Sequence, residues 1–217
     1  MYLSSAMRLD ISFIVCKLSR FMSNLSSDHW RVLERVLCYL KGTMSYEIHY
    51  SGHPAVLEGY SDVNWISDID ELYVTSGYVF TIDCGVVSWR SCEQTILTRL
   101  IMEAELVALD TATVEADWLR ELLMDLPMVE NGPVPTIRMN YENQVIVKVN
   151  SAKDNAKLSR HVKRRLKSVR KMRNSGVISL TYIQTDKNLT DPFTKGLSRN
   201  VIESASREMG LRPIQLP

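Results

Sequence analysis

Four acidic residues stand at the ends of predicted secondary-structure elements. They are Asp62 where the first strand of a predicted sheet ends, Glu105 near the start of a long helix, Glu142 at the end of the fourth strand and Asp191 at the opening of the last helical segment. Converging carboxylates suit hard divalent cations such as Mg²⁺, and a pair of such ions promotes in-line attack on a phosphodiester. Acids at element ends also serve helix capping and solubility, so their spacing alone leaves a metal site and an ordinary surface both open.

Positive charge gathers in one segment of the chain. Residues 151–175 contain ten Lys and Arg against one acid, although the net charge of the whole chain is +1. A charge run usually marks a solvated helix face, but these cations cover more of the predicted helix than one face requires, and Leu166 and Val169 supply few core contacts. We therefore predict that this helix binds phosphates. The candidate contacts are Arg160, Lys163, Arg164, Arg165, Lys167, Arg170, Lys171 and Arg173.

Hydrophobic periodicity predicts the elements that must position these residues. Two amphipathic helices come first, with Asp10 and Asp28 as their N-caps. After them we expect an antiparallel run of strands at residues 56–62, 77–82 and 86–90, a helix at 101–126, a strand at 136–141, a short helix at 144–149, the basic helix at 157–173, a strand at 177–184 and a helical region from Asp191. This order predicts an α/β (α+β) fold with a mixed five-stranded sheet flanked by helices.

The composition argues against several classes of protein. The chain has 217 residues, of which 45% are hydrophobic and 24% charged, as in ordinary globular domains. No segment approaches the roughly 18–20 apolar residues of a membrane span, and the N-terminus lacks the pattern of a secretion signal. We expect an intracellular protein without a membrane partner. The four cysteines are scattered and the four histidines lack zinc spacing, which argues against a zinc site.

Several short motifs follow one another in a specific order. They are Gly59-Tyr60-Ser61-Asp62, Thr75-Ser76-Gly77-Tyr78-Val79-Phe80, Val87-Ser88-Trp89-Arg90-Ser91, Met102-Glu103-Ala104-Glu105-Leu106, Trp118-Leu119-Arg120, Glu142-Asn143-Gln144 and Asn188-Leu189-Thr190-Asp191-Pro192-Phe193-Thr194-Lys195. Together they resemble the ribonuclease H domain of copia-type LTR retrotransposon Pol polyproteins. Residues 2–50 resemble the end of the reverse transcriptase domain upstream in those polyproteins. We therefore expect residues 1–52 to be a helical remnant of that domain and residues 53–217 to be ribonuclease H-like, with no polymerase active site in this chain.

The resemblance implies a site, a substrate and partners. Its catalytic and metal-binding residues would be Asp62, Glu105, Glu142 and Asp191, holding two Mg²⁺ ions for which Mn²⁺ could substitute. Asn143 and Gln144 would contact nucleic acid. The implied reaction is metal-dependent hydrolysis of the RNA strand of an RNA–DNA hybrid during reverse transcription. The expected partners are that hybrid and the reverse transcriptase part of the same polyprotein, and the expected location is cytoplasmic or particle-associated.

One of the four acids departs from the family pattern. Position 142 carries Glu where the family has Asp. The extra methylene would move the carboxylate by more than the roughly 0.5 Å that a preorganised metal site tolerates, unless the backbone adapts. The alternative function is therefore a catalytically impaired nucleic-acid-binding remnant of a degenerate or domesticated element.

Overall fold

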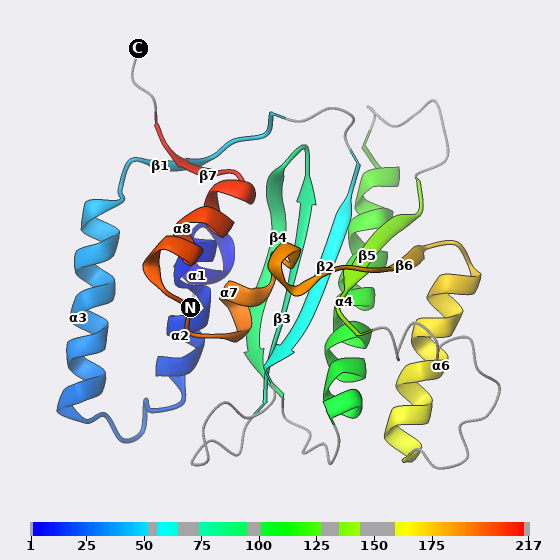
Figure 1. The fold of residues 1–217 in the computed structure, drawn as a ribbon, viewed down its shortest axis with the longest axis horizontal. Coiled ribbons are helices and arrows are strands. Elements are labelled where there is room, and N and C mark those ends of the chain that lie inside the picture. Colours follow the sequence, from blue (N-terminus) through cyan, green and yellow to red (C-terminus); the bar gives the residue numbers. More distant parts are fainter. Residues whose placement is uncertain are drawn as a thin grey trace.

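A mixed sheet of five strands organises the computed structural model, which describes residues 2–51, 56–64, 74–94, 101–126, 135–143 and 159–214 (Figure 1). In spatial order the strands are β4 (Gly85–Glu93), β3 (Thr75–Ile82), β2 (Glu58–Asn64), β5 (Ile137–Tyr141) and β6 (Ile178–Tyr182). The first three are antiparallel, whereas β5 runs parallel to β2 and β6 parallel to β5. The predicted fold class is therefore confirmed, and every strand end lies within three residues of its predicted position.

Strand β3 lies inside the sheet and is buried on both faces. Its side chains alternate, so Tyr78 and Phe80 face one layer of helices while Val79 faces the other. The tight turn to β4 places Asp83 and Cys84 at φ values of 52° and 60°. Two successive residues with positive φ match the twist that a two-residue hairpin requires.

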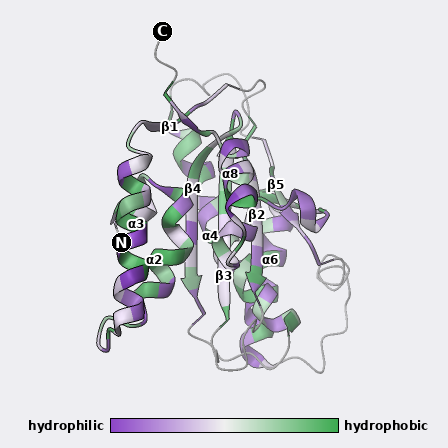
Figure 2. Ribbon diagram, turned by 60° about the vertical axis from the view of Figure 1, so that its left-hand side comes forward, coloured by the Kyte–Doolittle hydropathy of each residue, from purple (hydrophilic) through white to green (hydrophobic). Residues whose placement is uncertain are grey.

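Two long helices, α4 (Ile101–Met124) and α6 (Arg160–Asn174), cover one face of the sheet. Helix α6 buries Val162, Leu166 and Val169, which follow one another at helical spacing and join the main core. Figure 2 shows the hydrophilic residues that dominate the rest of this helix. The prediction that Leu166 and Val169 supply few core contacts is therefore wrong, because three apolar residues at this spacing form a complete stripe.

The opposite face is covered by short helices from both ends of the chain. These are α1 (Tyr2–Ala6), η1 (Leu9–Ile11), α2 (Ser12–Ser19), α7 (Asp191–Thr194) and α8 (Arg199–Glu208). Leu9 packs there with Val79, Phe193 and Met209. A second, two-stranded sheet pairs β1 (Tyr46–Ile48) with β7 (Leu211–Pro213). The first 50 residues thus share a core and a sheet with the C-terminal part of the chain.

Helix α3 (Ser27–Gly42) stands beside α2 at the edge of the molecule (Figure 1). Its N-cap is Ser26, whose hydroxyl accepts from the His29 amide in a capping box, so the prediction of Asp28 as the cap is wrong. Asp10 caps no helix either. It accepts hydrogen bonds from the Arg8 guanidinium and the Tyr39 hydroxyl, both at 2.6 Å from Oδ2. None of the helices among the described residues is long and apolar enough to cross a membrane.

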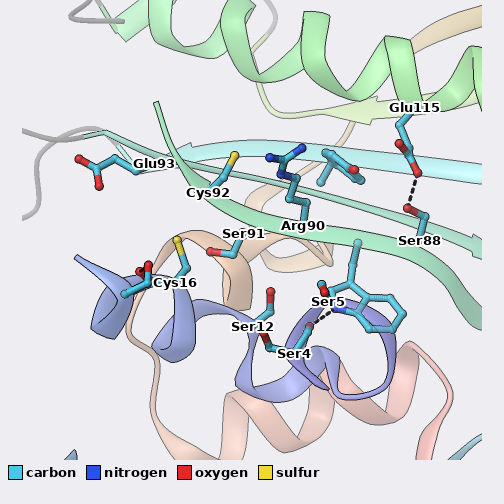
Figure 3. Close-up of a pocket in the computed structure, with 13 residues that line it drawn as sticks. Ser4, Ser5, Ser12, Cys16, Ser88, Arg90, Ser91, Cys92, Glu93 and Glu115 are labelled. Atoms are coloured by element: carbon cyan, nitrogen blue, oxygen red, sulfur yellow. Dashed lines mark hydrogen bonds between the residues drawn. The ribbon is translucent and has the colours of Figure 1, made fainter. Parts of the chain in front are cut away.

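A cavity of about 560 Å³ lies between the N-terminal helices and β4 (Figure 3). Its two acidic residues already have partners. Glu115 accepts from the Ser88 hydroxyl at 2.6 Å, and Glu93 forms an ion pair with Arg20 at 3.0 Å. The carboxylates that converge on one another lie elsewhere, at one edge of the main sheet.

Candidate metal centre

Three carboxylates meet at the carboxyl end of two parallel strands. Asp62 lies near the end of β2 and Glu142 directly follows β5, and the residues before them, Ser61 and Tyr141, are partners in the β2–β5 register. Parallel neighbours end at the same edge of a sheet, so the two acids are brought side by side. Asp191, the first residue of α7, completes the group. One ligand oxygen of each of the three lies within 4.8 Å of the others.

Glu105 approaches the same site from the first two turns of α4. It lines a cavity of about 430 Å³ together with Asp62, Glu142 and Asn143. Its Oε2 accepts hydrogen bonds from the Tyr141 hydroxyl, at 3.2 Å, and from the Asn143 amide. Glu105 is therefore held at the rim of the three-carboxylate group, and all four predicted acids face one region.

The longer side chain of Glu142 has its own support. Asn188 donates to Oε1 at 2.8 Å and Thr185, at the start of η3 (Thr185–Lys187), donates to Oε2 at 3.0 Å. Asn188 itself is buried, and its other amide atom accepts from the Thr190 backbone at 3.1 Å. Glu142 is thereby oriented within the carboxylate group despite its extra methylene. Sequence analysis did not single out Thr185 or Asn188 as supporting residues.

Two further residues at the end of α7 touch the cluster. The buried Thr194 hydroxyl donates to Asp62 Oδ2 at 2.7 Å. The Lys195 ammonium lies 2.8 Å from Asp191 Oδ1 and 3.5 Å from Asp62 Oδ2. Sequence analysis gave neither residue a role, although Lys195 stands four positions after Asp191, the spacing at which helical side chains meet.

Burial raises the pKa of two of these carboxyls, and the charges of the neighbouring carboxylates add to the rise. Burial is the main cause for Asp62, and the Lys195 charge and the Thr194 hydrogen bond oppose it. Burial also raises the pKa of Glu105, against its hydrogen bonds from Asn143 and Tyr141. Carboxylate oxygens that lie close together and repel one another are the donor set that a hard divalent cation prefers. The residues present therefore fit Mg²⁺ or Mn²⁺.

The predicted nucleic-acid contacts differ in their surroundings. Asn143 lies at the site and donates to Glu105, while Gln144 lies outside the described residues. On α6, Arg165 forms an ion pair with Asp110 of α4 at 2.7 Å, so the fold uses it to join two helices. The exposed cations of the helix are Arg160, Lys163, Arg164, Lys167 and Lys171, and Arg170 and Arg173 are partly buried.

The absence of a side chain at Gly77 lets α7 reach the site. Gly77 is the partner of Asp62 in the β2–β3 register. A Cβ at this position would lie 2.8 Å from Phe193 Cβ and 3.1 Å from Thr194 Cγ2. We expect Gly77→Ala to push α7 outward, lowering stability by about 1–3 kcal/mol through overpacking and Mn²⁺ affinity by about 10-fold or more through the displaced support of Asp62.

Urea unfolding and calorimetric titration with Mn²⁺ would measure both effects. Gly42→Ala is the matched control, because a Cβ there meets nothing within 4 Å. Unchanged stability and unchanged Mn²⁺ affinity in the Gly77 variant would contradict the close contact between α7 and β3.

The chain is similar to several known proteins. No protein-family model matches it. It is 30% identical over 205 residues to the retrovirus-related Pol polyprotein from transposon RE2 of Arabidopsis thaliana, covering 94% of this chain and 14% of that protein. It is 28% identical over 211 residues to the Pol polyprotein from transposon TNT 1-94 of Nicotiana tabacum, covering 97% of this chain and 16% of that one. The chain thus spans about a seventh of the length of these relatives.

A shorter relative and one solved structure complete the comparison. Secreted RxLR effector protein 161 of Plasmopara viticola is 42% identical over 120 residues, which are 55% of this chain and 84% of that protein. A foamy viral protease-reverse transcriptase, solved as its dRH form in complex with double-stranded DNA, matches with a TM-score of 0.51 and 14% identity, covering 83% of this chain and 29% of that one. At that identity the match bears on the fold alone.

Proposed function

We infer that the chain belongs to the family of retrovirus-related Pol polyproteins from copia-type transposons, and we propose that it acts as the ribonuclease H part of such a polyprotein. Its substrate would be the RNA strand of an RNA–DNA hybrid. The observation that carries the proposal is the convergence of Asp62, Glu142 and Asp191 within 4.8 Å at the edge where β2 and β5 end.

The proposed site assigns a task to each group of residues. Asp62, Glu142 and Asp191 would hold the metal, with Glu105 beside them. When bound, Mg²⁺ lowers the pKa of a coordinated water and neutralises charge on the phosphodiester. The chain's own contribution is to orient these carboxylates, through the hydrogen bonds of Thr194 to Asp62 and of Asn188 to Glu142. Contacts to the 2′-hydroxyl would distinguish RNA from DNA.

A second candidate function follows from Glu142. Both of its carboxylate oxygens accept hydrogen bonds, from Asn188 and Thr185. If these bonds kept the carboxylate from the metal, the chain would bind hybrids without cleaving them. The two functions differ in their response to Glu142→Asp. We favour cleavage, because Glu142 lies within the three-carboxylate group together with Asp62 and Asp191.

The test is a cleavage and retention assay with a labelled RNA–DNA hybrid, in Mg²⁺ and then in Mn²⁺. We expect the unaltered chain to cleave the RNA strand. Glu142→Asp should cleave about 10- to 100-fold more slowly, because the shorter side chain loses its contacts with Asn188 and Thr185. Retention without cleavage by the unaltered chain, with cleavage gained in Glu142→Asp, would instead establish the binding remnant. A chain that neither cleaves nor retains the hybrid would contradict both functions.

A further inference from the structure

A lysine ammonium lies where the carboxylates of the site converge. Lys195 Nζ is 2.8 Å from Asp191 Oδ1 and 3.5 Å from Asp62 Oδ2. These two acids belong to the three whose oxygens lie within 4.8 Å of one another. The positive charge of Lys195 is therefore placed against the same donors that would bind a metal ion.

We propose that Lys195 is the counter-cation of the metal-free chain, which competes with the divalent ion for Asp62 and Asp191 and withdraws when the ion binds. The inference rests on the proposed function, since it assumes that the carboxylates bind a metal. An ammonium and a metal ion that use the same oxygens repel each other at a separation of a few ångströms. The bound ion therefore gains only the difference between its own attraction to the carboxylates and that of the lysine.

The structure allows Lys195 to leave without disturbing the carboxylates. Its side chain is 32% exposed, whereas that of Asp62 is 10% exposed. Lysine carries a compact charge on a flexible four-carbon stem, so its ammonium can move to solvent while its backbone stays in place. Thr194 keeps its hydrogen bond to Asp62 Oδ2 at 2.7 Å, because its side chain is fully buried. Thr194 thus fixes the orientation of Asp62, and Lys195 supplies the exchangeable charge.

Two consequences follow for a variant that lacks the charge. Without metal, the carboxylates of Asp62, Glu142 and Asp191 would repel one another with less compensation, so the chain should be less stable. With metal, no competing cation would have to be displaced, so the affinity for the divalent ion should rise. A side chain with a merely structural role would lower stability equally in both conditions.

The experiment compares Lys195→Met with the unaltered chain by calorimetric titration with Mn²⁺ and by thermal unfolding with and without Mg²⁺. Lys187→Met, on the neighbouring exposed turn η3, is the matched control because it removes the same charge outside the cluster. We expect Lys195→Met to bind Mn²⁺ about 10-fold more tightly, because no competing cation has to be displaced, and Lys187→Met to bind as the unaltered chain does. The melting temperature of Lys195→Met should be lower without metal and recover in Mg²⁺.

Lys195→Gln keeps a hydrogen-bond donor for Asp191 and should show the same gain in affinity, which separates the loss of charge from a loss of packing. Unchanged or weaker Mn²⁺ binding in both Lys195 variants would overturn the inference while leaving the metal centre intact. If the unaltered chain and every variant failed to bind Mn²⁺, the proposed function itself would be overturned, and the inference with it.

Discussion

Asp62→Asn and Glu105→Gln are each expected to lower Mg²⁺-dependent cleavage of the RNA strand by about a thousandfold, equivalent to about 4 kcal/mol of transition-state stabilisation. Asp62 is one of the three carboxylates whose oxygens lie within 4.8 Å of one another, and Glu105 lines the same cavity. An amide offers a neutral oxygen in place of an anionic one, so the site would bind the metal ion more weakly. The attacking water would then lose the activation that the ion supplies. Single-turnover assays with a labelled hybrid would measure the loss.

Glu121→Gln is the matched control for Glu105→Gln, since it makes the same change at an exposed position of α4. Removal of the metal with EDTA should reduce the unaltered chain to the level of the two site variants. Cleavage that survives Asp62→Asn or Glu105→Gln would show that these carboxylates do not carry the reaction. Calorimetry with Mn²⁺ would show whether the lost activity comes from a lost ion, because each variant should also bind Mn²⁺ more weakly.

The sequence predicts the strands and the long helices of this fold well, because their apolar patterns are long enough to show a period. It also locates Asp62 and Glu142 at strand ends, and the parallel pairing of β2 with β5 then brings them together. Short elements carry no such pattern. Strands β1 and β7 have three residues each and form only because distant parts of the chain pair. Neither segment contains a local sequence pattern that predicts its pairing partner.

The residues around the carboxylates are harder to find for the same reason. Thr185 and Asn188 support Glu142 from positions 43 and 46 residues away in the chain. Their types are common in turns, so only the tertiary structure reveals the contact. The N-cap of α3 is also predicted wrongly, although the signal for a cap is local. Both Ser26 and Asp28 are good N-cap residues, and the backbone conformation decides that Ser26 takes the position.

The basic helix illustrates how one segment serves two purposes. Its apolar stripe of Val162, Leu166 and Val169 packs in the core, and Arg165 pairs with Asp110 of α4. Exposed cations remain on the outer side of the helix. Because β5, α6 and β6 form a parallel crossover, α6 begins at the edge of the sheet where β5 ends, which is the edge that carries the carboxylates. The exposed cations of α6 are therefore candidates for contact with a duplex that extends beyond the carboxylates.

Replacement of the exposed cations Arg164, Lys167 and Lys171 by Gln is expected to weaken hybrid binding by about 10- to 100-fold near 100 mM salt. These residues recur every three or four positions and so share one side of α6. Each phosphate contact that is lost should also reduce the slope of log affinity against log salt by about one unit. Fluorescence anisotropy with a labelled hybrid across a salt series would give both quantities.

A matched triple variant on α3, with Arg31, Arg35 and Lys41 changed to Gln, removes the same charge from exposed positions of another helix. It should leave the salt slope nearly unchanged, because net charge alone acts weakly at a distance beyond the screening length of about 10 Å in 0.1 M salt. Equal effects of the two triple variants would mean that α6 attracts nucleic acid only through net charge. If neither triple variant changed hybrid binding, the outer side of α6 would be an ordinary solvated helix face. The hybrid would then be held by the residues at the carboxylate edge.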